Sequence, residues 1–295
     1  MLIFLNGRFV PEEQAVISVF DRGFLYGDGL FETMLVANGK PFRWTQHLER
    51  LRRGAELLKV TIPFPQDSLR DFAEQLIHKN NLPDSLLRLT LSRGVGIRGY
   101  SPKGAEHPVL VMFLYPAPIH EPGSAGLPTS PGARQPIPPV KWKLITSSLR
   151  LPAGESLAQF KTCNKLPQIL ARAEADAAGA DEALLLNTDG FVVEGASSNL
   201  FWIDGDTVCT PPLAGGILAG VTRAVVLDIC RSLGVKTRES NVTPEELKHR
   251  HGAFLSLSSW GIVQAISLDG GVLHPSPLIE KLRTSYWELV RAETA

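Results

Sequence analysis

The 295-residue sequence is poor in cysteine and has no excess of charge of either sign. Its three cysteines, Cys163, Cys209 and Cys230, form no CxxC pair and no paired Cys/His spacing. This argues against a disulfide framework or a structural zinc site, and it favours a reducing compartment. Lysine plus arginine and aspartate plus glutamate both number 30. The chain therefore lacks the basic excess that nucleic-acid or membrane-surface binding requires.

Long apolar runs and common hydrolase motifs are also missing. No run of about 18 apolar residues appears, so no membrane span is expected. The opening MLIFLNGRFV is apolar but too short and too soon interrupted for the core of a signal peptide. There is no GxSxG, HExxH or GxxxxGK[ST] motif. We expect a soluble, cytoplasmic protein without a metal site, long enough for one large domain or two of ordinary size.

A stretch dense in proline and glycine divides the predicted elements into two blocks. Such a stretch is too rich in proline for a helix or a central strand. The sequence therefore predicts an α+β protein with an N-terminal domain at 1–116, a linker at 117–139 and a larger domain at 140–295. Before the linker we expect strands within Met1–Val10 and at 16–20, 30–37, 86–92 and 109–115, with helices from 45 and at 67–79. After it we expect helices at 166–177, from 221 and at 278–291, and strands at 183–187, 191–193, 199–203, 207–209 and 253–257.

A lysine and a glutamate mark the two ends of the stretch Gln159–Trp202. Lys161 precedes a helical pattern, and Glu194 directly follows a predicted hairpin. A lysine can form a Schiff base when neighbours or burial depress its pKa, although most such lysines are simply exposed. A carboxylate can hold a heterocyclic nitrogen protonated, or it can be an ordinary surface residue.

Other residues could bind a phosphate or a carboxylate. The run from Gly215 to Arg223 places Val221 and Thr222 at a helix start, where unpaired N–H groups suit a phosphate. From their predicted helix and strand, Arg50 and Ser258 could add donors, and Arg98 in a glycine-rich loop could bind a substrate carboxylate. Each group alone has an ordinary structural explanation. Together they supply the amine, pyridinium partner, phosphate cradle and carboxylate clamp that pyridoxal phosphate chemistry needs.

In this combination the sequence resembles the fold-type IV (class IV) aminotransferases, which use pyridoxal phosphate. The resemblance rests on Asp21-Arg22-Gly23 through Phe31-Glu32-Thr33, His47-Leu48-Glu49-Arg50-Leu51, Glu194-Gly195 through Asn199-Leu200-Phe201, and Gly220-Val221-Thr222-Arg223. It implies a small N-terminal α/β sandwich domain and a larger C-terminal pseudo-barrel domain, with the cofactor between them.

The same resemblance implies roles for individual residues. Lys161 would form the Schiff base, Glu194 would face the pyridine nitrogen, and Arg50, Val221 and Thr222 would hold the phosphate. Ser258 would add a hydroxyl, although this chain has Ser256-Leu257-Ser258 where the family usually has Ser-Gly-Thr.

Residues 92–101 bear on the substrate. Ser92 through Ser101 is similar to the R-G-x-G-x-R-G-Y-S loop of aminodeoxychorismate lyases. This favours conversion of 4-amino-4-deoxychorismate to 4-aminobenzoate and pyruvate, a folate precursor step, with Phe31, Arg98 and Tyr100 binding the substrate. The alternative is an aminotransferase acting on branched-chain L-amino acids or D-amino acids with 2-oxoglutarate. Both activities take a small amino-acid-like substrate. In the family this loop reaches the neighbouring subunit's site, which implies a homodimer.

Overall fold

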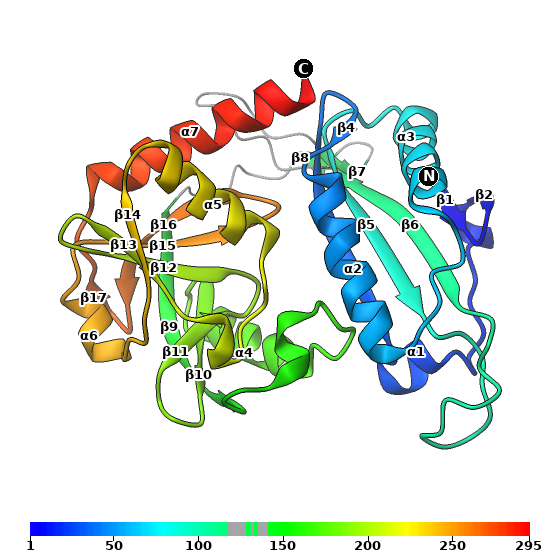
Figure 1. The fold of residues 1–295 in the computed structure, drawn as a ribbon, viewed down its shortest axis with the longest axis horizontal. Coiled ribbons are helices and arrows are strands. Elements are labelled where there is room, and N and C mark those ends of the chain that lie inside the picture. The colour runs from blue at the N-terminus through cyan, green and yellow to red at the C-terminus, as the bar shows by residue number, and fades with distance from the viewer. Residues whose placement is uncertain (117–127, 131–132, 135–140) are drawn as a thin grey trace. The chain divides into compact units, whose positions relative to one another are not determined.

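The computed structural model describes residues 1–116, 128–130, 133–134 and 141–295. It divides into two compact units, which are described separately (Figure 1). Unit 1 contains Met1–Ile137, Phe160–Asn164 and Val290–Ala295, and unit 2 contains Pro138–Gln159 and Lys165–Leu289. The expected linker at 117–139 lies outside the described residues, apart from 128–130 and 133–134.

Two segments beyond residue 140 belong to unit 1 and not to the continuous C-terminal domain that the sequence suggested. Residues 160–164 form backbone hydrogen bonds with a strand of unit 1. The chain terminus is held by an ion pair of 2.8 Å between Arg43 Nη2 and Glu293 Oε1. Residues 160–164 and the C-terminal residues thus pack with unit 1, although they come late in the sequence.

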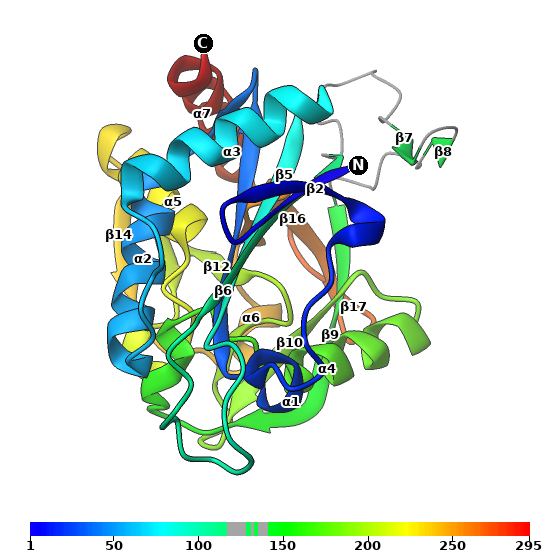
Figure 2. The same ribbon diagram turned by 90° about the vertical axis from the view of Figure 1, so that its right-hand side faces the viewer.

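Unit 1 is built on a six-stranded antiparallel sheet with the order β2-β1-β6-β5-β3-β4. Three helices and a short 3-10 turn, Glu12–Gln14, complete it, and Figure 2 shows this unit from the side. The elements are β1 (Leu2–Leu5), β2 (Arg8–Pro11), α1 (Arg22–Tyr26), β3 (Gly29–Ala37), β4 (Lys40–Pro41), α2 (Trp44–Leu58), α3 (Gln66–Asn80), β5 (Ser85–Ser92) and β6 (Val109–Pro116). A separate strand pair is formed by β7 (Pro128–Ser130) and β8 (Ala133–Arg134).

The two faces of this sheet differ because side chains alternate along each strand. Leu87, Leu89 and Leu91 of β5 are fully buried in the core that the sheet shares with α2 and α3. Arg88 and Thr90, at the intervening positions, lie on the opposite face. The register pairs Arg88 with Thr33 and with Phe113, so this second face is partly polar.

The expected strand at 16–20 is wrong. The segment is irregular and ends in a turn, with Val16 and Phe20 exposed at 74% and 64%. Its alternating pattern resembles a strand, but among the described residues no strand pairs with it. Several of its backbone groups form local turn hydrogen bonds instead: the Val16 N–H donates to the Gln14 carbonyl, and the Ser18 carbonyl accepts from the Asp21 N–H.

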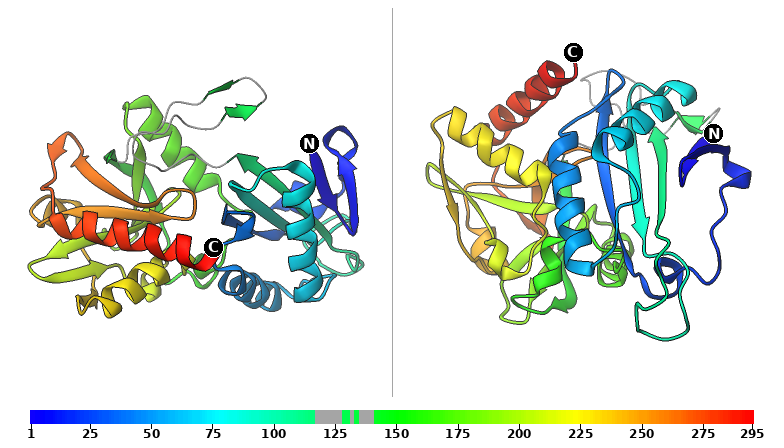
Figure 3. Two further views of the ribbon diagram at one scale, coloured as in Figure 1. Left: turned by 90° about the horizontal axis from the view of Figure 1, so that it is seen from above. Right: turned by 45° about the vertical axis from the view of Figure 1, so that its right-hand side comes forward.

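Unit 2 is organised around a barrel-like sheet, as expected. Its strands follow the order β11-β10-β9-β16-β15-β12, and pairing of β11 with β12 closes the ring. β13 and β14 extend the sheet beyond β12, and β17 pairs with β16. α5 packs against β14 and β15, and α4 packs against β9 and β10 (Figure 3). No helix in the described residues is long and apolar enough to cross a bilayer.

The strands of unit 2 are β9 (Lys141–Leu151), β10 (Glu182–Asn187), β11 (Val192–Gly195), β12 (Asn199–Asp204), β13 (Thr207–Thr210), β14 (Lys236–Glu239), β15 (Ala253–Leu257), β16 (Gly261–Leu268) and β17 (Gly271–Val272). The helices are α4 (Leu166–Ala177), α5 (Val221–Ser232), α6 (Pro244–Lys248) and α7 (Pro277–Thr294), with 3-10 turns at Ser156–Gln159 and Leu213–Gly215.

Candidate active site

Lys161 is fixed to the edge of strand β3 by its backbone. The Phe31 N–H donates to the Lys161 carbonyl at 2.8 Å, and the Cys163 N–H donates to the Gly29 carbonyl at 2.9 Å. Leu30 and Thr162 form an antiparallel bridge between these two hydrogen bonds. The lysine is therefore held by the sheet of unit 1, although it lies far along the sequence.

Two cations lie over the ring of Phe31. The Lys161 Nζ is 4.8 Å from the ring centroid, and the guanidinium carbon of Arg88 is 3.4 Å from it. Such contacts are favourable because the face of an aromatic ring is electron-rich. Burial lowers the pKa of the Arg88 guanidinium, which nevertheless stays protonated at any ordinary pH. Lys161 and Arg88 thus share one aromatic ring, and a guanidinium there is suited to a carboxylate.

Arg88 was not among the site residues expected from the sequence. The available signal was an arginine inside the otherwise apolar and hydroxyl-bearing strand Ser85–Ser92. An arginine at such a position often has a ligand or a buried partner, since burying a bare charge is costly.

Arg50 belongs to a buried cluster with Glu32 and His47. The side chains of Glu32, His47 and Arg50 are 1%, 2% and 8% exposed. Arg50 Nε donates to Glu32 Oε1 at 2.8 Å and Nη2 donates to Oε2 at 2.5 Å, while His47 Nδ1 lies 2.7 Å from Oε2. His47 and Arg50 both face the sheet from α2, because each interacts with the buried Glu32 carboxylate.

The cluster also sets the charges of its members. Burial alone would raise the pKa of Glu32, but the charge and hydrogen bonds of Arg50 and the hydrogen bond with His47 lower it to about 2. Burial lowers the pKa of His47 and favours its neutral form. A bidentate carboxylate fixes the plane of a guanidinium, so Glu32 orients Arg50.

In unit 2 the Glu194 carboxylate is held by two donors. The Leu218 N–H donates to Glu194 Oε2 at 2.9 Å, and Asn199 Nδ2 donates to the same oxygen at 3.4 Å. Asn199 Nδ2 also donates to the Leu218 carbonyl at 3.0 Å. These hydrogen bonds fix the orientation of the carboxylate.

Ser256 lies in line with these two residues across the sheet. The register pairs Glu194 with Asn199 and Asn199 with Ser256, which places all three side chains on one face. Ser256 is 2% exposed, and its hydroxyl has no hydrogen-bond partner among the described residues. Ser258, which the sequence analysis chose, lies partly exposed in the turn after β15.

Glu182 holds the turn between β11 and β12. This fully buried carboxylate accepts hydrogen bonds from the Ser197 N–H at 3.1 Å, from the Ser197 hydroxyl at 2.5 Å and from the Ser198 hydroxyl at 3.2 Å. The turn leads directly from Glu194 to Asn199. The sequence analysis assigned no role to Glu182, whose position at the start of an apolar strand was the only signal.

Helix α5 begins without a capping side chain. Gly220 is the N-cap residue and makes no side-chain hydrogen bond, and Val221 and Thr222 form the first turn. A Cβ atom at Gly220 would lie 1.9 Å from Asn199 Oδ1, so only glycine fits between the helix start and the Glu194 group. The N–H groups of the first turn and the positive end of the helix dipole suit a phosphate.

Arg98 and Tyr100 lie on the loop between β5 and β6. Both are exposed, Tyr100 at 88%, and the Tyr100 ring meets the Tyr26 ring edge-on at 5.7 Å. In unit 1, Lys161 thus contacts the Phe31 ring, and Arg50 forms an ion pair with Glu32. Unit 2 groups Glu194 with the start of α5.

These groups fit pyridoxal phosphate. In unit 2 the uncapped first turn of α5 and the Thr222 hydroxyl are donors suited to a phosphate. In unit 1 the Arg50 guanidinium, oriented by Glu32, is another donor of this kind. The Glu194 carboxylate suits a ring nitrogen, and the Lys161 amine suits an aldehyde. The buried Ser256 hydroxyl is a further donor, since a buried polar group without a partner is costly unless a ligand or water satisfies it.

Comparison with known proteins agrees with this chemistry. Residues 29–268 match the family model described as Amino-transferase class IV. A Methanocaldococcus jannaschii protein described as a "Putative branched-chain-amino-acid aminotransferase" is 34% identical over 93% of this chain and 90% of its own. The aminodeoxychorismate lyase of Bacillus subtilis is 28% identical over 91% of this chain and 87% of its own.

A solved structure has the same fold. The branched-chain aminotransferase of the archaeon Thermoproteus uzoniensis, solved with norvaline, matches with a TM-score of 0.86 at 28% identity, over 98% of this chain and 94% of that one. The chain therefore belongs to the class IV aminotransferases, a family of enzymes that use pyridoxal phosphate.

Proposed function

We propose that Lys161 is the catalytic base and covalent anchor of this enzyme. The observation that best supports this proposal is that the Lys161 amine and the Arg88 guanidinium both lie over the Phe31 ring. Arg50, Val221, Thr222 and Ser258 bind the phosphate, Val221 through its backbone N–H. Glu194 keeps the ring nitrogen protonated.

The proposed substrate is an amine that carries two carboxylates. Arg88 supplies one cation near the amine of Lys161, and Arg98 supplies a second on its loop, supported by Tyr100. Phe31 packs against the substrate between them. Arginine is suited to this role because its planar fork binds a carboxylate through two hydrogen bonds.

The reaction that these residues support best is the lyase reaction. In it 4-amino-4-deoxychorismate loses pyruvate and becomes 4-aminobenzoate. When bound, pyridoxal phosphate withdraws electrons from the carbon that bears the amine. Lys161 would take the proton from that carbon, and the ring carbon–oxygen bond would break, so that enolpyruvate leaves as the ring becomes aromatic. Enolpyruvate would then take up a proton and become pyruvate. Support comes from Arg98-Gly99-Tyr100 and from the similarity to the Bacillus subtilis lyase.

Transamination is the second candidate. It is favoured by the 34% identity to the Methanocaldococcus jannaschii relative and by the match to the Thermoproteus uzoniensis aminotransferase. Here Lys161 moves the proton from the substrate carbon to the cofactor carbon, and a 2-oxo acid then accepts the amine. Branched-chain L-amino acids and D-amino acids with 2-oxoglutarate are the donors to test.

One assay separates the two candidates. The purified protein, supplied with pyridoxal phosphate, is given 4-amino-4-deoxychorismate without any keto acid. We expect release of 4-aminobenzoate and pyruvate in equal amounts, measured by chromatography. Transfer of an amine from L-leucine or D-alanine to 2-oxoglutarate, without any 4-aminobenzoate, would overturn the lyase and leave the aminotransferase.

We also infer a homodimer in the cytoplasm. Unit 1 exposes a set of large apolar side chains around α1 and the loop after β5, which suits burial against a second copy; it comprises Val16, Ile17, Val19, Phe20, Phe24, Leu25, Val95 and Ile97. All three cysteines are free thiols, as a reducing compartment allows. Light scattering should give twice the chain mass of 32.2 kDa, and a value of one chain mass would contradict the dimer.

A further inference from the structure

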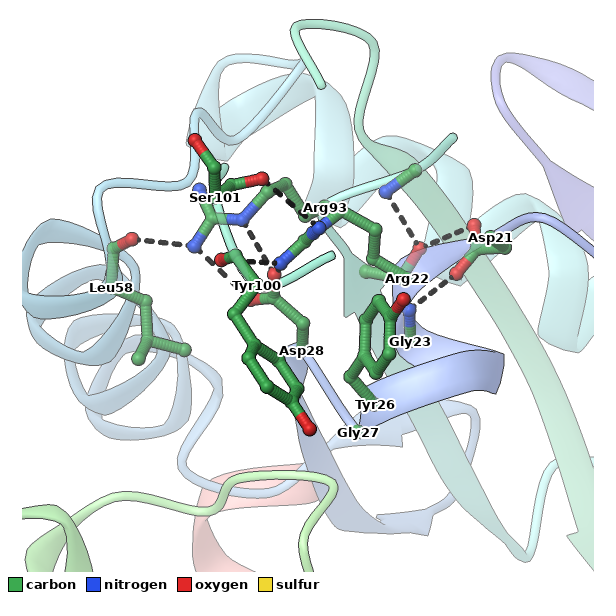
Figure 4. A network of polar contacts seen from close by, with 12 residues as sticks. Asp21, Arg22, Gly23, Tyr26, Gly27, Asp28, Leu58, Arg93, Tyr100 and Ser101 are labelled. Atoms are coloured by element: carbon green, nitrogen blue, oxygen red, sulfur yellow. Dashed lines mark hydrogen bonds and ion pairs between the residues drawn. The ribbon is translucent and has the colours of Figure 1, made fainter. Parts of the chain in front are cut away.

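One arginine of α1 donates three side-chain hydrogen bonds to the loop after β5. Arg22 Nη1 donates to the carbonyls of Gly99 at 2.8 Å and Ser101 at 3.1 Å, and Nη2 donates to the carbonyl of Tyr100 at 3.1 Å. Figure 4 shows these contacts converging on one guanidinium. Three consecutive carbonyls, all directly after Arg98, thus share one donor group.

Asp28 fixes this arginine from the other side. Arg22 Nε donates to Asp28 Oδ2 at 2.8 Å, and Arg93 Nε donates to the same oxygen at 2.8 Å. Burial alone would raise the pKa of Asp28, but the hydrogen bonds from Arg93 and Arg22 lower it. The carboxylate is therefore the counter-ion of both arginines, and it holds the Arg22 guanidinium in one plane.

Arg93 connects the same cluster to the end of helix α2. Its Nη2 donates to the Leu58 carbonyl at 2.7 Å and its Nη1 donates to the Lys59 carbonyl at 3.0 Å. These are carbonyls at the C-terminal end of a helix, where a cation is favourable. These two hydrogen bonds connect the start of the loop to α2, the helix that carries Arg50.

The loop also packs closely on the Arg22 side chain. A Cβ atom at Gly96 would lie 3.0 Å from Arg22 Cδ and 2.9 Å from Ala105 Cβ. The Arg22 guanidinium lies 5.0 Å from the centroid of the Tyr26 ring, whose hydroxyl accepts from the Gly99 N–H at 3.4 Å. Arg22 is only 4% exposed although it lies on a surface element. The arrangement is built around this arginine and leaves Arg98 itself exposed.

We propose that Arg22, oriented by Asp28, is a positioning residue that fixes the loop backbone so that Arg98 meets a substrate carboxylate. This deepens the proposed function and rests on the role given there to Arg98. A loop residue that binds a ligand gains affinity when its backbone is already ordered, because less conformational entropy is lost on binding. Arg22 supplies that order without touching the substrate.

The test is Arg22→Lys, which keeps the charge but removes the planar fork that reaches three carbonyls. Hydrogen exchange of peptides covering residues 96–104 should become at least about tenfold faster. The KM for 4-amino-4-deoxychorismate, or for 2-oxoglutarate if the enzyme is an aminotransferase, should rise about tenfold, while kcat stays within about twofold. Arg52→Lys, at an exposed arginine of α2, is the matched control and should change neither quantity.

The outcomes separate this inference from the proposed function. Unchanged exchange in Arg22→Lys would overturn the positioning role. The positioning role would also be overturned if Arg22→Lys exchanged faster but kept the wild-type KM while a separate Arg98→Ala variant raised the KM. If Arg98→Ala itself leaves the KM unchanged, the substrate role of Arg98 fails and the positioning proposal falls with it. Asp28→Asn should repeat the Arg22→Lys result, because it removes the charge that orients Arg22.

Discussion

Lys161→Ala is expected to lower kcat/KM by at least about 10,000-fold, because it removes both the covalent anchor and the base. The measurement combines steady-state rates with borohydride reduction of the cofactor-loaded protein. In the wild type, mass spectrometry of the peptides should find the reduced adduct on Lys161. In the variant the adduct should be absent.

Lys165→Ala is the matched control, since it removes a lysine only four residues along the chain. It should keep the adduct on Lys161 and most of the activity. An adduct that persists in Lys161→Ala would show that another lysine is the anchor. A variant without the adduct but with near wild-type turnover would contradict the covalent role itself.

Glu32→Gln is expected to have the largest effect on stability. The substitution keeps the shape of the side chain but removes the charge that compensates the buried Arg50 guanidinium. Removing one partner of a buried ion pair costs about 3–5 kcal/mol of unfolding free energy. Urea unfolding measures this change, and cofactor titration should show weaker binding because Arg50 is no longer oriented. Glu49→Gln, an exposed glutamate on the same helix as Arg50, is the control and should change stability little.

The same cluster predicts a direction for the dependence on pH. The pKa of Glu32 is about 2 in the folded protein, below its ordinary value of 4.5, so the stability it supplies is complete above about pH 4.5 and lost as the pH falls toward 2. The lowered pKa of His47 acts in the same direction from about pH 6.5 downward, because the unfolded chain takes up a proton that the folded one does not. The stability difference between wild type and Glu32→Gln should therefore shrink between about pH 4.5 and pH 2. A difference that stays constant over this range would show that the Glu32 charge is not the source.

Local signals in the sequence predicted much of the fold. Thr243 and Glu246 have the three-residue spacing of a capping box, and the structure has both of its hydrogen bonds. The expected helix at 166–177 agrees with α4, and the strands expected within Met1–Val10 are β1 and β2. These features depend on residues a few positions apart, so a single sequence contains the information.

Contacts between distant segments could not be predicted in this way. The parallel pairing of β9 with β16 joins two segments that are far apart in the sequence, and no hairpin signal marks it. Glu32 pulls His47 and Arg50 inward, yet nothing near Glu32 in the sequence shows that a helix will cover it. The proximity of Arg88 to Lys161 likewise depends on pairing between elements more than 70 positions apart.

The pairing of residues 160–164 with strand β3 has a consequence for dividing the protein into fragments. A fragment that ends at residue 116 keeps Phe31 and the Glu32 cluster but carries no Lys161. A fragment that starts at residue 141 carries Lys161 but not the strand edge on which its backbone rests. Neither fragment contains both Lys161 and the strand edge that holds its backbone. Activity from a split protein would therefore require the two fragments to re-form the hydrogen bonds at Gly29 and Phe31. A cut in the surface turn Asn38-Gly39 would separate Lys161 from the same strand edge, so it would carry the same requirement.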